Sequence, residues 1–144
     1  MLLSKEVAVF LNLAACKLKK YTALALKQNE VNLTPEQFLV LDLLWNNGSM
    51  SQQKLADTMH KDKNSITKFI DGLEKKKLVE RHRDNNDRRS NLIVLTQKAE
   101  EMKMDTKEKG CSMLEDILEG ISDDELRNFL STLNKITENM DTHN

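Results

Sequence analysis

The middle of the chain carries a group of small polar and basic side chains whose chemistry suits contact with a nucleic acid. These residues are Asn64, Ser65, Thr67 and Lys68. Hydroxyl and amide groups can donate and accept hydrogen bonds at base edges, and a lysine ammonium can reach guanine or a phosphate. On their own, however, the same four residues are equally compatible with an ordinary solvated helix face.

A second charged group follows at the predicted tip of a hairpin. Arg88 and Arg89 come directly after the run Asp84-Asn85-Asn86-Asp87, whose residues favour a turn. Arginines at such a tip suit a narrow minor groove, where the potential of DNA is most negative. An acid is unfavourable beside phosphates, so we expect Asp87 to pair with an arginine and fix its direction. The alternative is a solvated charged turn.

The helix that must present the first group is predicted from the spacing of its apolar residues. Residues 63–76 place Ile66, Phe69, Ile70 and Leu73 on one stripe, which is typical of a packed helix face. Because these residues are committed to packing, the small polar residues between them are expected to face outward.

The neighbouring elements complete a recognisable DNA-reading unit. Ser51 is placed to cap a preceding helix at residues 52–59. Residues 78–83 and 91–95 alternate between apolar and polar side chains, which predicts two strands. Two short helices followed by a two-stranded wing make a winged helix-turn-helix. The second helix of such a unit enters the major groove, and the first crosses the DNA backbone.

Long helices are predicted on both sides of this unit. Residues 5–28 carry an apolar face close to heptad spacing, formed by Val7, Leu11, Ala14, Leu18, Tyr21 and Ala25. Thr34, Pro35 and Gln37 mark the start of the next helix, and we expect Gly48 to end it as a left-handed cap. Thr96 opens a further helix that runs to about residue 120, and Ser122 with Glu125 forms a second capping box before the last one.

The predicted fold class is therefore mainly α with a small β wing, in the order α-α-α-α-β-β-α-α, with a short extra strand near Met50. Residues 33–96 would form the winged helix-turn-helix lobe. Residues 1–32 and 97–144 would form a helical dimerisation region. A helix as long as the first cannot bury so wide an apolar face against a small lobe, so we expect part of it to meet a second subunit.

Composition and charge set the broad class of the protein. The 144 residues suit one domain, or two small lobes that share a core. The net charge of −1 argues against a nucleic-acid partner, but residues 51–95 hold 11 Lys/Arg against 7 Asp/Glu, whereas residues 96–144 hold 6 against 12. The basic middle could therefore face a polyanion while the acidic end points away from it.

The sequence contains no apolar run of about 18 residues that could span a membrane. It also lacks the order of regions typical of a signal peptide. We therefore expect a cytoplasmic protein with no membrane partner, in which Cys16 and Cys111 are reduced thiols.

Several of these segments together resemble the MarR family of transcriptional regulators over nearly the whole chain. The residues that carry the resemblance are Leu33-Thr34-Pro35-Glu36-Gln37-Phe38, Leu55-Ala56, Ser65-Ile66-Thr67-Lys68, Leu73-Glu74-Lys75-Lys76, Leu78-Val79-Glu80-Arg81, Asp87-Arg88-Arg89-Ser90 and Leu95-Thr96. The segment from Asp87 to Ser90 resembles the wing signature of the family, Asp-x-Arg-Ser/Ala.

This resemblance implies a homodimer that binds a pseudo-palindromic double-stranded DNA operator, most simply as a repressor relieved by a small aromatic or amphipathic effector. The effector would bind between the dimer helices and the DNA-binding lobe. The residues implied to contact DNA are Asn64, Ser65, Thr67 and Lys68 in the major groove, Arg89 with Arg88 in the wing, and Ser51, Gln52 and Lys54 near the DNA backbone.

Two positions depart from the family pattern. The family usually has glycine where Lys77 stands, so this lysine is expected to adopt a left-handed conformation or to change the turn. The family often has arginine where Lys68 stands. A lysine cannot grip guanine or phosphate in a bidentate manner, so base specificity at this position is expected to differ.

The remaining candidate residues could have roles other than DNA binding. Cys16 has three lysines nearby that could activate its thiol for redox sensing on the same scaffold, although its place beside the apolar stripe favours a small packing residue. The three histidines and two cysteines show no metal-ligand spacing, and no catalytic motif is present, so neither a cofactor nor an enzyme activity is expected. A winged-helix module that binds only protein is the other alternative.

Overall fold

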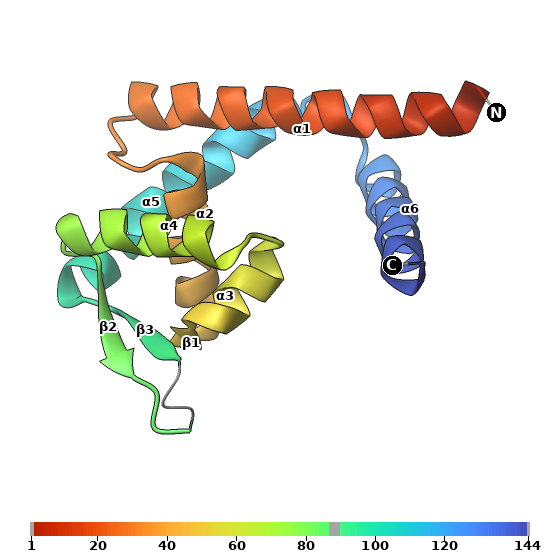
Figure 1. Ribbon diagram of the computed structural model, residues 1–144. Coiled ribbons are helices and arrows are strands. Elements are labelled where there is room, and N and C mark those ends of the chain that lie inside the picture. The colour runs from red at the N-terminus through yellow and green to blue at the C-terminus, as the bar shows by residue number, and fades with distance from the viewer. Residues whose placement is uncertain (1, 87–89, 144) are drawn as a thin grey trace. The chain divides into compact units, whose positions relative to one another are not determined.

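The computed structural model describes residues 2–86 and 90–143, which form six helices and three short strands (Figure 1). The elements are α1 (Leu2–Gln28), α2 (Pro35–Asn47), β1 (Met50–Ser51), α3 (Gln52–Met59), α4 (Lys63–Lys75), β2 (Val79–Arg83), β3 (Asn91–Leu95), α5 (Gln97–Ile117) and α6 (Asp123–Thr142). The predicted fold class and element order are confirmed, including the extra strand at Met50.

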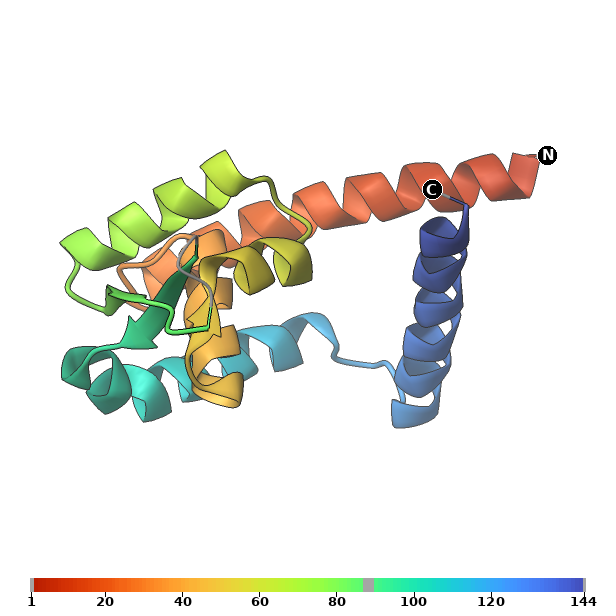
Figure 2. The ribbon, with the colours of Figure 1, turned by 60° about the horizontal axis from the view of Figure 1, so that its bottom comes forward.

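The chain divides into two compact units. Residues 1–111 contain everything from α1 to most of α5, and residues 112–144 contain the end of α5 and α6. In the first unit, α2, α3 and α4 gather beside the small sheet, as Figure 2 shows. The candidate DNA-reading elements therefore all belong to one unit.

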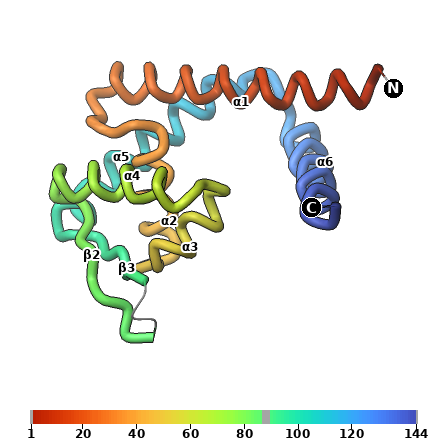
Figure 3. The backbone as a smooth tube through the Cα atoms, in the orientation of Figure 1, coloured from red at the N-terminus to blue at the C-terminus, as the bar shows by residue number. Residues whose placement is uncertain are grey.

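The sheet is antiparallel and has the order β1-β3-β2. Ile93 in the central strand lies opposite Met50 on one side and Arg81 on the other. The longer pair, β2 and β3, extends from the helices as a hairpin, which Figure 3 shows in green below α4. This hairpin is the wing, and its pairing begins with Val79 opposite Leu95 next to the core.

The core of the first unit follows the predicted apolar stripes. Ile66, Ile70 and Leu73 of α4 are fully buried, as is Ile93 of the sheet, whereas Phe69 is only half-buried. The other large side chains with almost no exposure come from α1, α2, α3 and the start of β2, namely Leu26, Val40, Leu41, Leu44, Leu55 and Val79. The buried stripe of α4 thus fixes which of its faces remains outside.

The helix starts are capped as the sequence predicts. The Thr34 hydroxyl accepts the Gln37 N–H at 3.2 Å, and the Gln37 side chain accepts the Thr34 N–H at 3.2 Å. Ser51 caps α3 in the same way, by accepting the Lys54 N–H at 3.0 Å. Ser122 and Glu125 form the reciprocal pair at the start of α6. These caps satisfy backbone donors that a helix end leaves without an intrahelical partner.

Gly48 ends α2 differently from the prediction. Its φ is +77°, but its ψ is −164°, so it is not in the left-handed helical region. The chain must pass from the end of α2 directly into the extended strand β1, and this combination of angles is one that essentially only glycine adopts. The expectation of a left-handed cap was therefore wrong, although the need for glycine was correct.

Lys77 adopts the left-handed conformation that the family pattern reserves for glycine, with φ at +60°. The Leu78 N–H donates to the Leu73 carbonyl at 3.0 Å, and the Lys77 N–H donates to the Glu74 carbonyl at 2.9 Å. These two bonds are the Schellman pattern that closes a helix C-terminus. The turn thus has the geometry usual in the family, and the side chain of Lys77 makes that geometry less favourable than it would be for glycine.

Replacing Lys77 with glycine is expected to raise the free energy of unfolding by about 1 kcal/mol, because the clash between the lysine Cβ and its own backbone disappears. Chemical denaturation followed by circular dichroism would measure the change. Lys75→Gly is the matched control, since this residue lies in the right-handed last turn of α4. The control should lose stability, and a loss in both variants would contradict the assignment.

Two glycines inside helices permit close packing that the sequence did not reveal. A Cβ built on Gly110 of α5 would lie 2.7 Å from Phe38 Cζ, and one built on Gly72 of α4 would lie 2.4 Å from Gln37 Nε2. Both distances are shorter than side-chain contacts allow. Gly110 therefore allows α5 to approach α2.

Large apolar side chains remain exposed on α1 and α6. Phe10, Leu13 and Leu24 of α1 are 57% to 69% exposed, and Phe129 and Leu130 of α6 are 55% and 63% exposed. No residue of α6 within the described chain is buried. Among the described residues, none of the helices is both long enough and apolar enough to cross a membrane.

Candidate nucleic-acid interface

The face of α4 opposite its buried stripe is the candidate recognition surface. Successive residues of a helix are turned by about 100°, so Asn64, Lys68, Asp71 and Lys75 lie together, opposite Ile66 and Leu73. All four outward residues are exposed. Asn64 and Lys68 are thus available as the sequence predicts, and Lys75 joins them on the same stripe.

Ser65 and Thr67 lie on the two flanks of this stripe and are only half-buried. Their side chains are also not free, because Ser65 faces Asp62 and Thr67 bonds to a neighbouring helix. The expectation that every small polar residue of α4 points freely outward was therefore wrong for these two positions.

Asp62 caps the N-terminus of α4. Its carboxylate accepts the Ser65 N–H at 2.7 Å. The backbone N–H of Ser65 and then the Ser65 side chain hold the pKa of Asp62 below its usual range. Because the carboxylate occupies the anion-binding end of the helix, a DNA phosphate cannot use the same N–H group. This cap was not predicted from the sequence, although an acid directly before a helix is a recognised start signal.

Replacing Asp62 with leucine is expected to lower the melting temperature at neutral pH, because the cap and its negative charge at the helix N-terminus are both lost. The folded pKa of Asp62 is depressed, so its contribution to stability is present above the unfolded pKa, about 3.9, and is lost as pH falls through the folded value. The difference between the parent and this variant should therefore shrink as the pH is lowered.

The isosteric variant Asp62→Asn separates the cap from the charge. It should retain most of the stability at neutral pH and show a flatter acid limb in melting experiments from pH 7 to pH 3. A pH-independent difference between the parent and Asp62→Asn would contradict the role of the ionised carboxylate.

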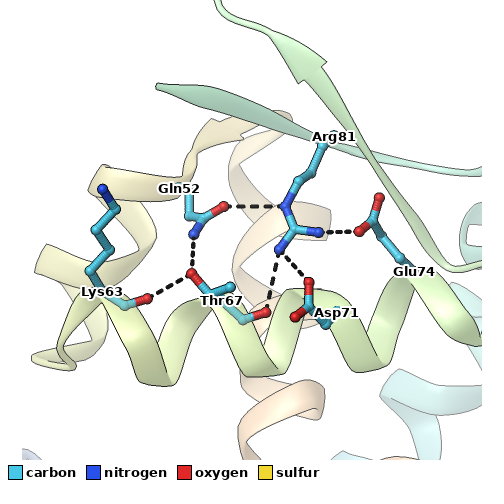
Figure 4. A network of polar contacts seen from close by, with 6 residues as sticks. All are labelled: Gln52, Lys63, Thr67, Asp71, Glu74 and Arg81. Carbon is cyan, nitrogen blue, oxygen red and sulfur yellow. Dashed lines mark hydrogen bonds and ion pairs between the residues drawn. The ribbon is translucent and has the colours of Figure 1, made fainter. Parts of the chain in front are cut away.

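A polar network joins α3, α4 and β2 next to the recognition surface (Figure 4). The Arg81 guanidinium contacts Asp71 at 2.8 Å and also pairs with Glu74. The Gln52 amide donates to the Thr67 hydroxyl at 2.9 Å. Sequence reasoning placed Gln52 and Thr67 at the DNA surface, whereas the structure shows both side chains bonded within the protein.

The other predicted positions divide into three groups. Ser51 is half-buried and caps α3, whereas Lys54 is exposed on the same helix. Asp87, Arg88 and Arg89 lie outside the described residues. Their proposed roles in the wing therefore stay predictions.

Cys16 is exposed in the single chain, as is Cys111. The expectation that Cys16 packs as a small buried residue is thus wrong for the isolated subunit. Within the described part of the chain, no group of three or more histidine, cysteine or acidic side chains is placed to hold a metal ion.

The end of α4 is tied to the start of α2 on the far side of the lobe. The Lys76 ammonium donates to the Asn32 carbonyl at 2.9 Å and to Gln37 Oε1 at 2.7 Å. Burial lowers the pKa of Lys76. A cavity of about 460 Å³ lies beside it, lined by the end of α1 and the segment that leads to α2, namely Ala23, Lys27, Glu30, Val31, Asn32, Leu33 and Thr34.

Known proteins of the same type match both the sequence and the fold. The MarR family profile matches residues 33–90, which run from the segment before α2 to the residue before β3. The uncharacterised HTH-type transcriptional regulator YsmB of Bacillus subtilis (strain 168) is 32% identical over 112 residues, covering 78% of this chain and 77% of YsmB.

Two solved structures share the fold. The MarR-family transcriptional regulator from Rhodococcus sp. RHA1 is 27% identical and superposes with a TM-score of 0.80, covering 93% of this chain and 94% of that one. A mutant MarR protein of E. coli in complex with operator DNA is 20% identical, with a TM-score of 0.80 and coverage of 91% and 93%. On its fold and its sequence, the chain belongs to the MarR family of transcriptional regulators.

Proposed function

We propose that this regulator is a homodimeric repressor that binds a pseudo-palindromic operator through α4 and the wing, and releases it when a small ligand binds. The observation that carries the proposal is the exposed stripe of α4, in which Asn64, Lys68 and Lys75 lie on the side away from the core. Amide and ammonium groups on a helix of this size suit base edges and phosphates of the major groove. Lys54 of α3 is also exposed and would contact the DNA backbone.

The experiment that tests DNA binding is selection of bound fragments from the native genome, followed by affinity measurements on the enriched site. Lys68→Ala should weaken binding and reduce the slope of log K against log salt by about one per subunit if the ammonium contacts phosphate. Arg88→Ala/Arg89→Ala should weaken binding by at least about thirtyfold, since each arginine would contribute about 1–3 kcal/mol.

Lys109→Ala is a matched control for these variants, because Lys109 lies on α5 and pairs with Asp105 at 3.2 Å. Selection that enriches no DNA would contradict the proposed function and would favour a winged-helix module that binds only protein. Unchanged affinity in the wing variant would remove Arg88 and Arg89 from the interface.

A second subunit is proposed to cover the exposed apolar residues of α1 and α6. A single chain leaves Phe10, Leu13 and Phe129 more than half exposed. Large apolar side chains left exposed on a helix in this way mark an association site in a soluble protein. Two lobes held in one dimer would match two half-sites of an operator. Because its target is DNA, we place the protein in the cytoplasm.

The cavity beside Lys76 is the proposed effector site. Its lining is largely apolar but includes Lys27 and Lys76, which suits a small amphipathic ligand. Lys76 is the C-cap residue of α4, and its ammonium donates to the Asn32 carbonyl in the segment before α2. A ligand that bound this ammonium would therefore change the contacts at the end of the recognition helix. Screening small ligands by thermal shift, with Lys76→Met as the variant that loses the response, tests this site.

Thiol-based sensing by Cys16 is the second candidate function, favoured by the exposure of this thiol beside Lys19 and Lys20. Mild peroxide should release DNA from the parent and leave Cys16→Ser bound, because the thiol is the group that is oxidised. Cys111→Ser is the control. Equal release from the parent and Cys16→Ser would exclude Cys16 from the mechanism.

A further inference from the structure

Arg81 of β2 lies along one side of α4 and contacts three of its residues. Thr67, Asp71 and Glu74 are spaced by four and three residues, so they lie above one another on one face of the helix. One terminal nitrogen of the Arg81 guanidinium donates to the Thr67 carbonyl at 3.3 Å and pairs with Asp71 at 2.8 Å. The other terminal nitrogen of Arg81 pairs with Glu74. These contacts span two turns of α4, as Figure 4 shows.

Gln52 extends these contacts to α3 with a defined orientation. Its side-chain oxygen accepts from Arg81 Nε at 3.4 Å, and its nitrogen donates to the Thr67 hydroxyl at 2.9 Å. The Thr67 hydroxyl uses its single hydrogen to donate to the Lys63 carbonyl at 2.9 Å. Since a guanidinium can only donate, the amide oxygen must face Arg81 and the amide nitrogen must face Thr67. The network therefore has one consistent arrangement of donors and acceptors.

The surroundings of Arg81 make a direct contact with DNA phosphate unfavourable. Only 20% of its side chain is exposed, and its guanidinium is paired with two carboxylates. A phosphate would have to displace at least one of them. Arg81 instead makes four polar contacts that link β2 to α4 and α3.

This geometry constrains the rotation of α4 about its own axis. The buried stripe of Ile66, Ile70 and Leu73 holds the helix through apolar contacts, which are not directional. Hydrogen bonds and ion pairs are directional, so the contacts of Arg81 with Thr67, Asp71 and Glu74 resist a rotation that the apolar contacts alone would permit. Any rotation would move Asn64 and Lys68, because they belong to the same helix.

We infer that Arg81, through Gln52, is a positioning residue that sets the rotation of α4 and so determines which of its side chains meet the bases. The inference rests on the proposed function, because it concerns how the protein distinguishes one DNA sequence from another. It assigns Gln52 and Thr67 to the positioning network rather than to the DNA surface.

The test compares Arg81→Lys with the parent on the operator selected from the genome and on a scrambled duplex of the same length. Lysine keeps the charge but cannot hold four acceptors in fixed directions. The ratio of the two affinities should fall by about tenfold or more, comparable with the loss from a mismatched base pair. Affinity for the scrambled duplex and the salt slope should stay close to those of the parent, because no phosphate contact is removed.

Two further variants sharpen the result. Gln52→Leu should lower the same ratio, and the double variant with Arg81→Lys should lose less than the sum of the two single losses, since both substitutions act on one network. Arg127→Lys is the matched control, because it makes the same substitution at an arginine of α6 that pairs with Asp124 at 3.6 Å and is not part of the proposed DNA surface. The control should keep the affinity ratio of the parent.

Each contrary outcome has a distinct meaning. Equal losses on both duplexes with a smaller salt slope would show that Arg81 contacts phosphate and would overturn the inference. A lower melting temperature with an unchanged affinity ratio would leave Arg81 a purely structural role and also overturn it. In both cases DNA binding by the parent would stand. A parent protein that prefers no duplex would instead remove the proposed function, and the inference with it.

Discussion

Aspartates at Phe10 and Leu13 are expected to convert the proposed dimer into a monomer and to weaken operator binding by about a hundredfold to ten-thousandfold. The loss is large because two lobes joined in a dimer bind two half-sites with a high effective concentration, and separate lobes do not. Size-exclusion chromatography with light scattering would report the mass, and titration of a two-site and a one-site duplex would report the affinity.

The choice of these positions follows from the geometry of α1. With about 100° between successive residues, Phe10, Leu13 and Leu24 fall on one side of the helix. Leu26, which is fully buried, and Lys19, which pairs with Glu36 of α2 at 2.6 Å, fall on the side that faces the lobe. A charge at Phe10 or Leu13 should therefore disturb the surface between subunits and leave the contact between α1 and α2 intact.

Asn12→Asp is the matched control for the dimer prediction. It places the same charge on the same helix, but Asn12 lies near the side of Lys19 and is exposed, with its side chain donating to the Ala8 carbonyl at 2.9 Å. This control should remain dimeric and should bind the two-site duplex as the parent does. A variant with both aspartates that still had the mass of a dimer would show that another surface joins the subunits.

The helices of this protein could be predicted because each one depends on residues close together in the sequence. The buried stripe of α4 is formed by Ile66, Ile70 and Leu73, which lie within two helical turns of one another. The cap of α2 joins Thr34 with Gln37, which are three residues apart. The strands of the wing follow from alternation within five residues each. Lys77 was singled out because it stands where the family usually has glycine, and of the two outcomes expected there the structure shows the left-handed conformation.

The polar network could not be predicted because its partners are distant in the sequence. Gln52 and Arg81 are separated by 29 residues, and their contact depends on how β2 is placed beside α4. The same reason explains Gly110, whose value lies in its approach to Phe38 of another helix. The sequence placed Gln52 and Thr67 at the DNA surface, and only the packed structure shows that their side chains bond to each other.

Trp45→Ala is expected to lower the free energy of unfolding by about 3–5 kcal/mol, which is a large part of the stability of a domain of this size. Trp45 is only 6% exposed, and its indole N–H donates to the Ala99 carbonyl at 3.1 Å. The side chain thus joins α2 to the start of α5. Because Trp45 is the only tryptophan of the chain, unfolding should be followed by far-UV circular dichroism rather than by intrinsic fluorescence.

Trp45→Phe separates the two contributions of this side chain. It keeps an aromatic ring in the core but removes the donor to Ala99, so its cost should be smaller than that of Trp45→Ala, and the hydrogen bond accounts for about 1 kcal/mol of it. Both variants must be compared with the parent at equal protein concentration, since association of subunits adds to apparent stability. A loss below about 1 kcal/mol in Trp45→Ala would show that α2 and α5 are held together elsewhere, with the approach of Gly110 to Phe38 as the first contact to examine.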